Sequence, residues 1–209
     1  MGRLVAAATL VCVALALPAC TQTSDGVPAA AEQSSATNPT SATSVTSAPA
    51  GAPCAPAALP PVRVTAEIPE PGAPKAVVGV PDGWSMTAAP GGARLEGPDG
   101  MWATVTIAPS SPDAEEAFRT YTDDMTAETD ISTVSVLPGE LCGYPGQKLM
   151  GVLTGTDTPG SVQYEARIVH VTAAGQAYLI AVYVEAPGET PGFDAAATVV
   201  TGDFEISLP

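Results

Sequence analysis

The stretch Tyr178–Val184 has the sequence YLIAVYV, an unbroken run of apolar and aromatic side chains, most of them β-branched or aromatic. It lies within the longer candidate strand Gln176–Ala186, which turn residues separate from its neighbours. A short continuous run of this kind is typical of a strand that is covered on both faces. We therefore predict that this segment is the central strand of a sheet.

Other strand candidates surround this run, and Gly and Pro separate them from one another. The segment Gly97–Gly100 (GPDG) predicts the turn of a hairpin between two of them. A last short strand is expected around Phe204 and Ile206. The remaining candidates are Lys75–Val80, Ala93–Glu96, Met101–Ala108, Ser132–Leu137, Gly146–Leu153 and Val162–Thr172.

Two helices are expected between these strands. Ser111 is predicted to cap the first helix, with Pro112 at its first position. Its apolar residues form one stripe, made of Ala114, Ala117, Phe118, Tyr121 and Met125. Thr190 and Pro191 are predicted to open the second helix, and Gly202 to cap its end. Few helices beside many strands indicate an α+β fold, an antiparallel β-sheet flanked by helices, over residues 61–209.

The N-terminus predicts an export signal. Arg3 precedes the uncharged apolar stretch Leu4–Leu17, which is shorter than the about 20 residues needed to span a bilayer. The following Leu-Pro-Ala-Cys resembles the bacterial lipobox, in which cleavage leaves an N-terminal cysteine that carries lipid. Residues 1–19 are therefore predicted to be a lipoprotein signal peptide and Cys20 the lipidated residue, and an ordinary secretory signal is the alternative.

A low-complexity segment follows. Residues 20–60 are nearly all Ala, Ser, Thr, Pro and Gly, with Asp25 and Glu32 as their only charges and no aromatic side chain. Such a composition does not bury enough apolar surface to offset the entropy of ordering. The segment is predicted to be a disordered tether between the lipid and the domain.

The cysteine count predicts one disulfide. Cys12 leaves with the signal peptide and Cys20 takes the lipid, so Cys54 and Cys142 remain in an oxidising compartment. A Cys54–Cys142 bond is therefore predicted, and unpaired or intermolecular thiols are the alternative.

The charge of the chain limits its partners. Without Arg3, six basic residues face 22 acidic ones, so the formal charge is 6 − 22 = −16. Phosphate backbones and anionic headgroups repel such a surface, which argues against nucleic acid as a partner. Attachment to the membrane is therefore expected to come from the acyl chains on Cys20 alone.

No catalytic or metal site is predicted, and no cofactor. His170 is the only histidine and shares a strand face with apolar residues, so a buried role is expected. A calcium ion held by Asp123, Asp124, Glu128 and Asp130 is a weaker alternative to a solvated acidic face. The candidate binding residues are Tyr144, expected in an exposed turn beside the disulfide, and Trp84, for which a place in the core is the stronger expectation and a ligand contact the alternative.

The lipobox, the tether, the element Val80–Trp84 (VPDGW) and the helix after the third predicted strand together resemble the mycobacterial and actinobacterial LpqN-type lipoproteins. The resemblance covers residues 61–209. It implies a PsbP-like fold, an α/β/α sandwich around an antiparallel sheet. It also implies a role in the cell envelope, such as assisting lipid export or contacting partner proteins, and it supplies no catalytic residues.

These observations favour a non-enzymatic binding or accessory domain, anchored on the extracytoplasmic face of the cell membrane, that contacts proteins or envelope glycolipids. Two alternatives stay open. One is a carrier that encloses an acyl chain in an internal cavity, and the other is a small hydrolase that uses carboxylates.

Overall fold

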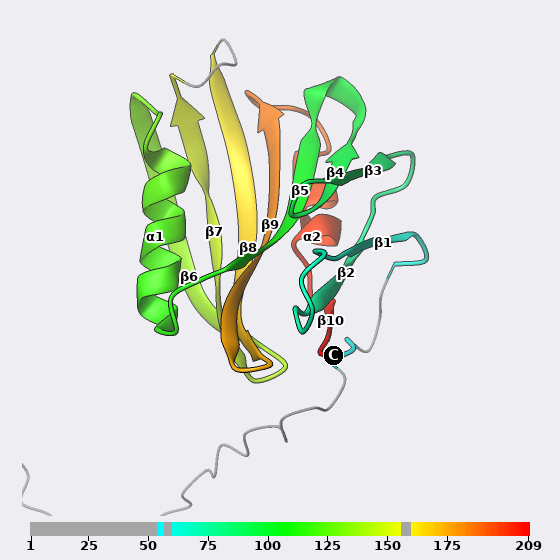
Figure 1. Cartoon of the computed structure of the whole chain (residues 1–209). Coiled ribbons are helices and arrows are strands. Elements are labelled where there is room, and N and C mark those ends of the chain that lie inside the picture. Colours follow the sequence, from blue (N-terminus) through cyan, green and yellow to red (C-terminus); the bar gives the residue numbers. More distant parts are fainter. Residues whose placement is uncertain (1–53, 57–59, 156–159) are drawn as a thin grey trace, which may run out of the picture. The chain divides into compact units, whose positions relative to one another are not determined.

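The computed structural model describes residues 54–56, 60–155 and 160–209. The predicted signal peptide, Cys20 and most of the predicted tether lie outside this part of the chain. Within it the fold is α+β, with antiparallel sheets and two helices, as the sequence predicts (Figure 1). No helix among these residues has both the length and the hydropathy needed to cross a membrane.

Seven strands form the larger sheet, in the order β3-β4-β5-β9-β8-β7-β6, and all neighbours are antiparallel. The predicted central strand is β9, which lies between β5 and β8. In chain order the strands are β3 (Ser85–Ala89), β4 (Gly92–Glu96), β5 (Trp102–Pro109), β6 (Ile131–Leu141), β7 (Tyr144–Thr154), β8 (Ser161–Ala173) and β9 (Gln176–Pro187).

A second, three-stranded sheet has the order β1-β2-β10 and was not predicted as a separate layer. It consists of β1 (Arg63–Ala66), β2 (Lys75–Gly79) and β10 (Glu205–Ser207). Its apolar residues and those of α2 (Phe193–Val200) pack against one face of the larger sheet and form the main core. Strands β1 and β3 were also missed, and the predicted turn between β4 and β5 is a short 3-10 helix, η1 (Pro98–Gly100).

The other face of the larger sheet carries α1 (Ala114–Thr126). The predicted apolar stripe of this helix packs against a second core cluster, around Tyr164, Ile168 and Leu149. The helix cap differs from the prediction. Asp113, and not Ser111, is the N-cap, and its carboxylate accepts a hydrogen bond from the Glu116 amide at 2.8 Å.

The bounds of α2 also differ from those predicted. The helix begins at Phe193, after Gly192 in a left-handed conformation with φ of 83°, and not at Thr190 and Pro191. Its C-cap is Thr201 in place of Gly202. The Thr190 hydroxyl donates to the Pro187 carbonyl, so this segment closes a turn after β9 before the helix begins.

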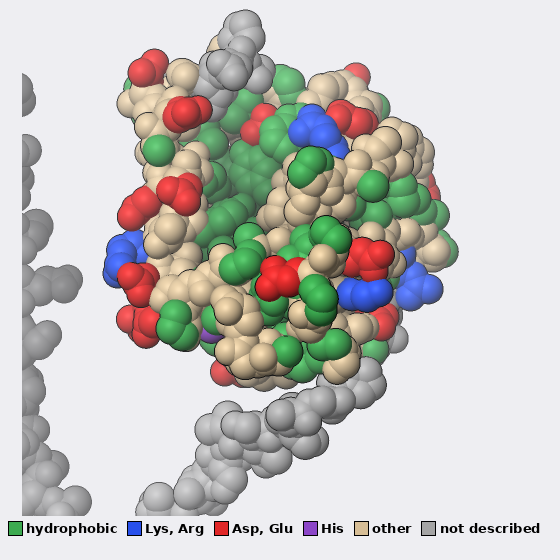
Figure 2. Space-filling model, viewed as in Figure 1, with side chains coloured by type: hydrophobic (Ala, Val, Ile, Leu, Met, Phe, Trp, Pro, Cys, Tyr) green, Lys and Arg blue, Asp and Glu red, His purple; other side chains and the backbone are tan. Residues whose placement is uncertain are grey.

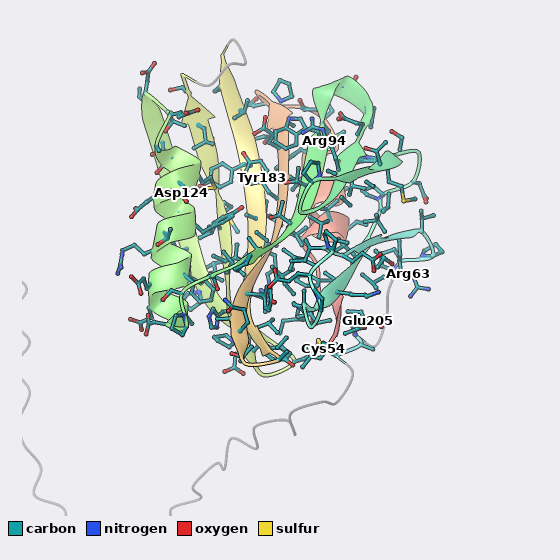
Figure 3. The ribbon with its side chains drawn as sticks, in the orientation of Figure 1. Cys54, Arg63, Arg94, Asp124, Tyr183 and Glu205 are labelled. Carbon is teal, nitrogen blue, oxygen red and sulfur yellow. A yellow bond between two sulfur atoms is a disulfide. The ribbon has the colours of Figure 1, made fainter. Side chains whose placement is uncertain are left out.

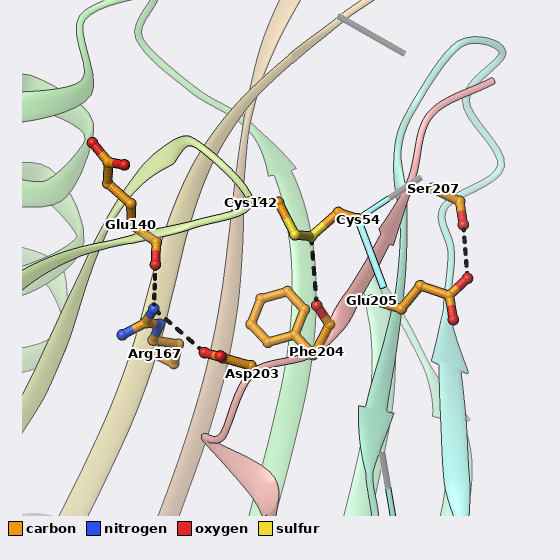
Figure 4. The surroundings of a disulfide bond; sticks show 8 residues. All are labelled: Cys54, Glu140, Cys142, Arg167, Asp203, Phe204, Glu205 and Ser207. Atoms are coloured by element: carbon orange, nitrogen blue, oxygen red, sulfur yellow. Dashed lines mark hydrogen bonds and ion pairs between the residues drawn. A yellow bond between two sulfur atoms is a disulfide. The ribbon is translucent and has the colours of Figure 1, made fainter. Parts of the chain in front are cut away.

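Cys54 and Cys142 lie at disulfide distance, with Cα atoms 5.5 Å apart and a sequence separation of 88, and Figure 4 shows the bond. Cys142 and Gly143 form the two-residue turn between β6 and β7, with φ of 54° and 81°. Cys54 pairs with Ile206, beside β10. The bond therefore joins the start of the domain and the smaller sheet to the far hairpin of the larger one.

Candidate functional site

The two predicted binding residues, Trp84 and Tyr144, do not line the groove of this domain. Trp84 is 9% exposed and belongs to the main core, where a Cβ added at Gly97 would collide with its indole ring. Tyr144 is the first residue of β7 and is half-buried against the same core, so it is not in the turn itself. The structure thus brings neither residue to the groove described next.

An open groove lies between α1 and the uncovered part of the larger sheet. The helix packs over β7 and β8, and on this face Trp102, Thr104 and Thr106 of β5 are only partly buried. The groove has a volume of about 640 Å³, and Figure 2 shows it as a hollow with a largely hydrophobic floor beside the helix. Its lining residues are Trp102, Thr104, Thr106, Tyr121, Asp124, Met125, Glu128, Thr129, Leu153, Gly155, Tyr183 and Glu185.

Strand alternation explains why these residues face the groove. In β5, Ala103, Val105 and Ile107 point into the main core, so Trp102, Thr104 and Thr106 point to the other face. Sheet register then sets Thr104 opposite Tyr183 of β9. The floor is therefore built on two paired strands at the centre of a sheet, which holds the side chains in fixed positions.

Aromatic rings form a continuous row across this face. Trp102 and Tyr183 have ring centroids 5.5 Å apart and tilted by 46°, and Tyr183 stacks on Tyr164 at 5.9 Å. The Tyr164 hydroxyl donates to the Thr133 carbonyl of β6, which fixes the inner end of the row. At the outer end, the Arg94 guanidinium lies over the Trp102 ring, 4.3 Å from its centroid.

Carboxylates provide all the negative charge of the lining. Asp124 lies near the end of α1, Glu128 lies in the turn that follows the helix, and Glu185 comes from β9. Figure 3 shows Asp124 on the helix and Tyr183 across the groove from it. The Tyr183 hydroxyl donates to the Glu185 carboxylate at 2.6 Å.

The tyrosines of this face are neutral near pH 7. Burial, assisted by the hydrogen bond to Glu185 and by its charge, raises the pKa of Tyr183 well above its usual value. Burial also raises the pKa of Tyr121, with a smaller effect of Tyr164, and raises the pKa of Tyr164 to about 12. Each ring is therefore an uncharged aromatic surface.

His170 has a structural role. It is buried, its Nε2 atom lies 2.9 Å from the Ser111 carbonyl oxygen, and its ring meets Phe118 edge-on at 6.5 Å. It thereby links β8 to the segment that leads into α1. This agrees with the buried place predicted for it.

Within residues 54–56, 60–155 and 160–209, no group of three or more His, Cys, Asp or Glu side chains is placed to hold a metal ion. The alternative of a calcium ion at Asp123, Asp124, Glu128 and Asp130 therefore has no support in this part of the chain. Of these four residues, the groove takes only Asp124 and Glu128 into its lining.

The groove was not predicted, although one feature of the sequence indicates part of its floor. Trp102, Thr104 and Thr106 alternate with apolar residues along β5, so a polar face on a central strand was visible in the sequence. Tyr183 gave no such signal, since it lies inside the continuous apolar run of β9. Asp124 and Glu128 appeared as ordinary solvated acids of a helix end.

The fold is similar to that of LpqN from Mycobacterium tuberculosis, a protein involved in cell envelope biogenesis. The two structures align with a TM-score of 0.54 and 14% sequence identity, over 70% of this chain and 91% of LpqN. No protein-family model matches the chain, and neither does any curated protein. The likeness supports the predicted fold of an antiparallel sheet flanked by helices, and at this identity it shows the fold alone.

Proposed function

We propose that this protein is a lipoprotein anchored through Cys20 on the extracytoplasmic face of the cell membrane, and that its domain is a non-catalytic accessory module of the cell envelope. The groove between α1 and β5–β9 is its binding site. The lipobox at Cys20 and the fold shared with an envelope-biogenesis protein support the location. Glycolipids or proteins of the envelope are the proposed class of partner.

The binding role rests on one observation: part of the groove floor, at Trp102, Thr104 and Thr106 of β5, is only partly buried. The opposite face of β5 is fully covered by the main core. On the groove side α1 contacts β7 and β8, and the β9 residue Tyr183 is 9% exposed at the edge of the second core cluster. A concave, preformed surface with a few polar groups is the usual form of a ligand site.

The groove favours surface binding over the two other functions. A carrier for acyl chains needs an enclosed apolar cavity, whereas this groove is open and carries three carboxylates. For hydrolysis, a carboxylate must be available to act as an acid or base. Glu185 instead accepts the hydrogen bond of Tyr183, so Asp124 and Glu128 are the lining carboxylates left for such a role.

The test is to fill the groove and observe contacts in intact cells. Thr104→Trp places a large ring on the floor, where the lining has a threonine, and leaves the opposite core face of β5 unchanged. Thr87→Trp is the matched control, because Thr87 is exposed on β3, in register with β4, and outside the groove. We expect chemical crosslinking to give adducts with the wild-type chain and with Thr87→Trp, and to lose them with Thr104→Trp. Equal adducts from all three chains would reject the groove as the binding site.

A further inference from the structure

The charge and hydrogen-bonding groups of the groove select one kind of ligand. Its charged lining residues are Asp124, Glu128 and Glu185, and none of its described lining residues is Lys, Arg or His. Carboxylates accept hydrogen bonds and do not donate them when ionised. These three carboxylates are therefore complementary to a group that only donates hydrogen bonds, or to a positive charge.

The hydroxyl groups of the lining strengthen this bias. Thr106 donates to the Ala181 carbonyl at 3.4 Å, and Thr129 donates to the Thr126 carbonyl at 2.8 Å. Tyr183 donates to Glu185. Three of the five lining hydroxyls thus donate inside the chain, whereas no hydrogen bond of the described residues engages the hydroxyls of Thr104 and Tyr121.

The aromatic row adds a second, independent preference. The faces of Trp and Tyr rings attract cations through the negative charge of their π surfaces. Within the described residues one cation already occupies such a face, since Arg94 stacks on Trp102 at the outer end of the row. Tyr121 from α1 and Tyr183 from β9 also line the groove, and Tyr183 is 9% exposed.

We infer that the groove binds an organic cation, an ammonium group carried on an apolar scaffold. The ammonium lies among the carboxylates of Asp124, Glu128 and Glu185, and the scaffold lies against the aromatic floor. This inference rests on the proposed binding role of the groove and names its ligand class. A neutral polyol fits less well because it brings no positive charge to the three carboxylates, and an acyl chain fits less well because it would lie against carboxylates.

Isothermal titration calorimetry tests the inference with two soluble probes of the same shape. Choline carries a trimethylammonium group, and 3,3-dimethyl-1-butanol is its neutral counterpart. With the full chain in a non-ionic detergent, we expect choline to bind with a Kd at least about tenfold lower than the alcohol, the size of one good cation–aromatic contact with ionic support. Equal affinities, or no binding of choline, would overturn the inference.

A matched pair of variants locates the site. Asp124→Asn combined with Glu128→Gln removes two charges from the rim, and we expect it to weaken choline binding by about fivefold or more. Asp123→Asn removes a charge from the neighbouring position of α1, outside the lining, and should change the Kd less than about twofold. An unchanged Kd in the double variant would also overturn the inference.

Failure of this inference is separable from failure of the proposed function. The crosslinking test with Thr104→Trp uses no cation. If choline does not bind but Thr104→Trp still abolishes the adducts, the groove is a binding site for another chemistry. If both tests fail, the proposed function fails as well.

Discussion

Removing the Cys54–Cys142 disulfide is predicted to destabilise the domain by several kcal/mol. The bond closes a loop with a sequence separation of 88. On the chain-entropy model, a loop of that length lowers the entropy of the unfolded chain enough to stabilise the fold by about 4.6 kcal/mol at 25 °C. We expect Cys54→Ala/Cys142→Ala to lower the free energy of unfolding by about 3–5 kcal/mol, a large part of the about 5–15 kcal/mol typical of a domain.

The assay is urea unfolding followed by tryptophan fluorescence, since Trp84 is buried in the main core. Each single variant, Cys54→Ala or Cys142→Ala, should lose nearly as much as the double variant because either one breaks the bond. The slope of the unfolding free energy with urea should increase, since the unlinked chain exposes more surface. A loss below about 1 kcal/mol, or single variants that differ strongly from the double variant, would refute the entropic explanation.

Three further results are expected. Gly97→Ala should lower the free energy of unfolding by about 1–3 kcal/mol because the new Cβ collides with the Trp84 ring. Gly139→Ala is the control: its Cβ meets only an ordinary van der Waals contact, so the change should stay within about 0.5 kcal/mol. Thermal melts followed by circular dichroism compare the two variants. The pKa of Tyr164 is raised to about 12 from its usual 10.0, so the fold favours the neutral phenol. The free energy of unfolding should therefore fall as the pH rises from about 10 to about 12, and this residue contributes up to about 1.4 kcal/mol per pH unit. Urea titrations across this pH range measure the slope, and Tyr164→Phe should remove the contribution of Tyr164 to it. Cys20→Ala should release a folded domain from the membrane fraction, and a variant still sedimenting with membranes would contradict anchoring by lipid alone.

The sequence was sufficient for the central part of the fold. The unbroken run Tyr178–Val184 predicts a strand covered on both faces, and the structure places main core on one side and the α1 cluster or groove on the other. The apolar stripe of α1 was equally visible, because its spacing matches the helical repeat. The Cys54–Cys142 pair was predicted because these two cysteines remain once Cys12 is assigned to the signal peptide and Cys20 to the lipid.

Other parts of the fold leave little trace in the sequence. Strand β3 is exposed at four of its five residues, so it has no alternation between buried and exposed positions, and pairing with β4 makes it a strand. Strand β1 is only four residues long. The division into two sheets depends on pairing between distant segments, such as β2 with β10, which local patterns do not encode.

The groove was hidden for a related reason. Whether Tyr183 is a core residue or a floor residue depends on where α1 lies across the sheet, and not on its neighbours in the sequence. Trp84 was named as a binding candidate, although a place in the core was the stronger expectation for it. The structure places Trp84 in the core and Trp102 in the lining of the groove.

Photocrosslinking from single positions in living cells tests most directly whether the groove is the binding site. A photoreactive phenylalanine at position 104 lies on the groove floor, and the same residue at position 87 lies on β3 outside it. If the groove is the binding site of an envelope accessory protein, position 104 gives a discrete adduct and position 87 gives none. Adducts at position 87 alone, or at neither position in cells that display the protein, would contradict a binding role for the groove.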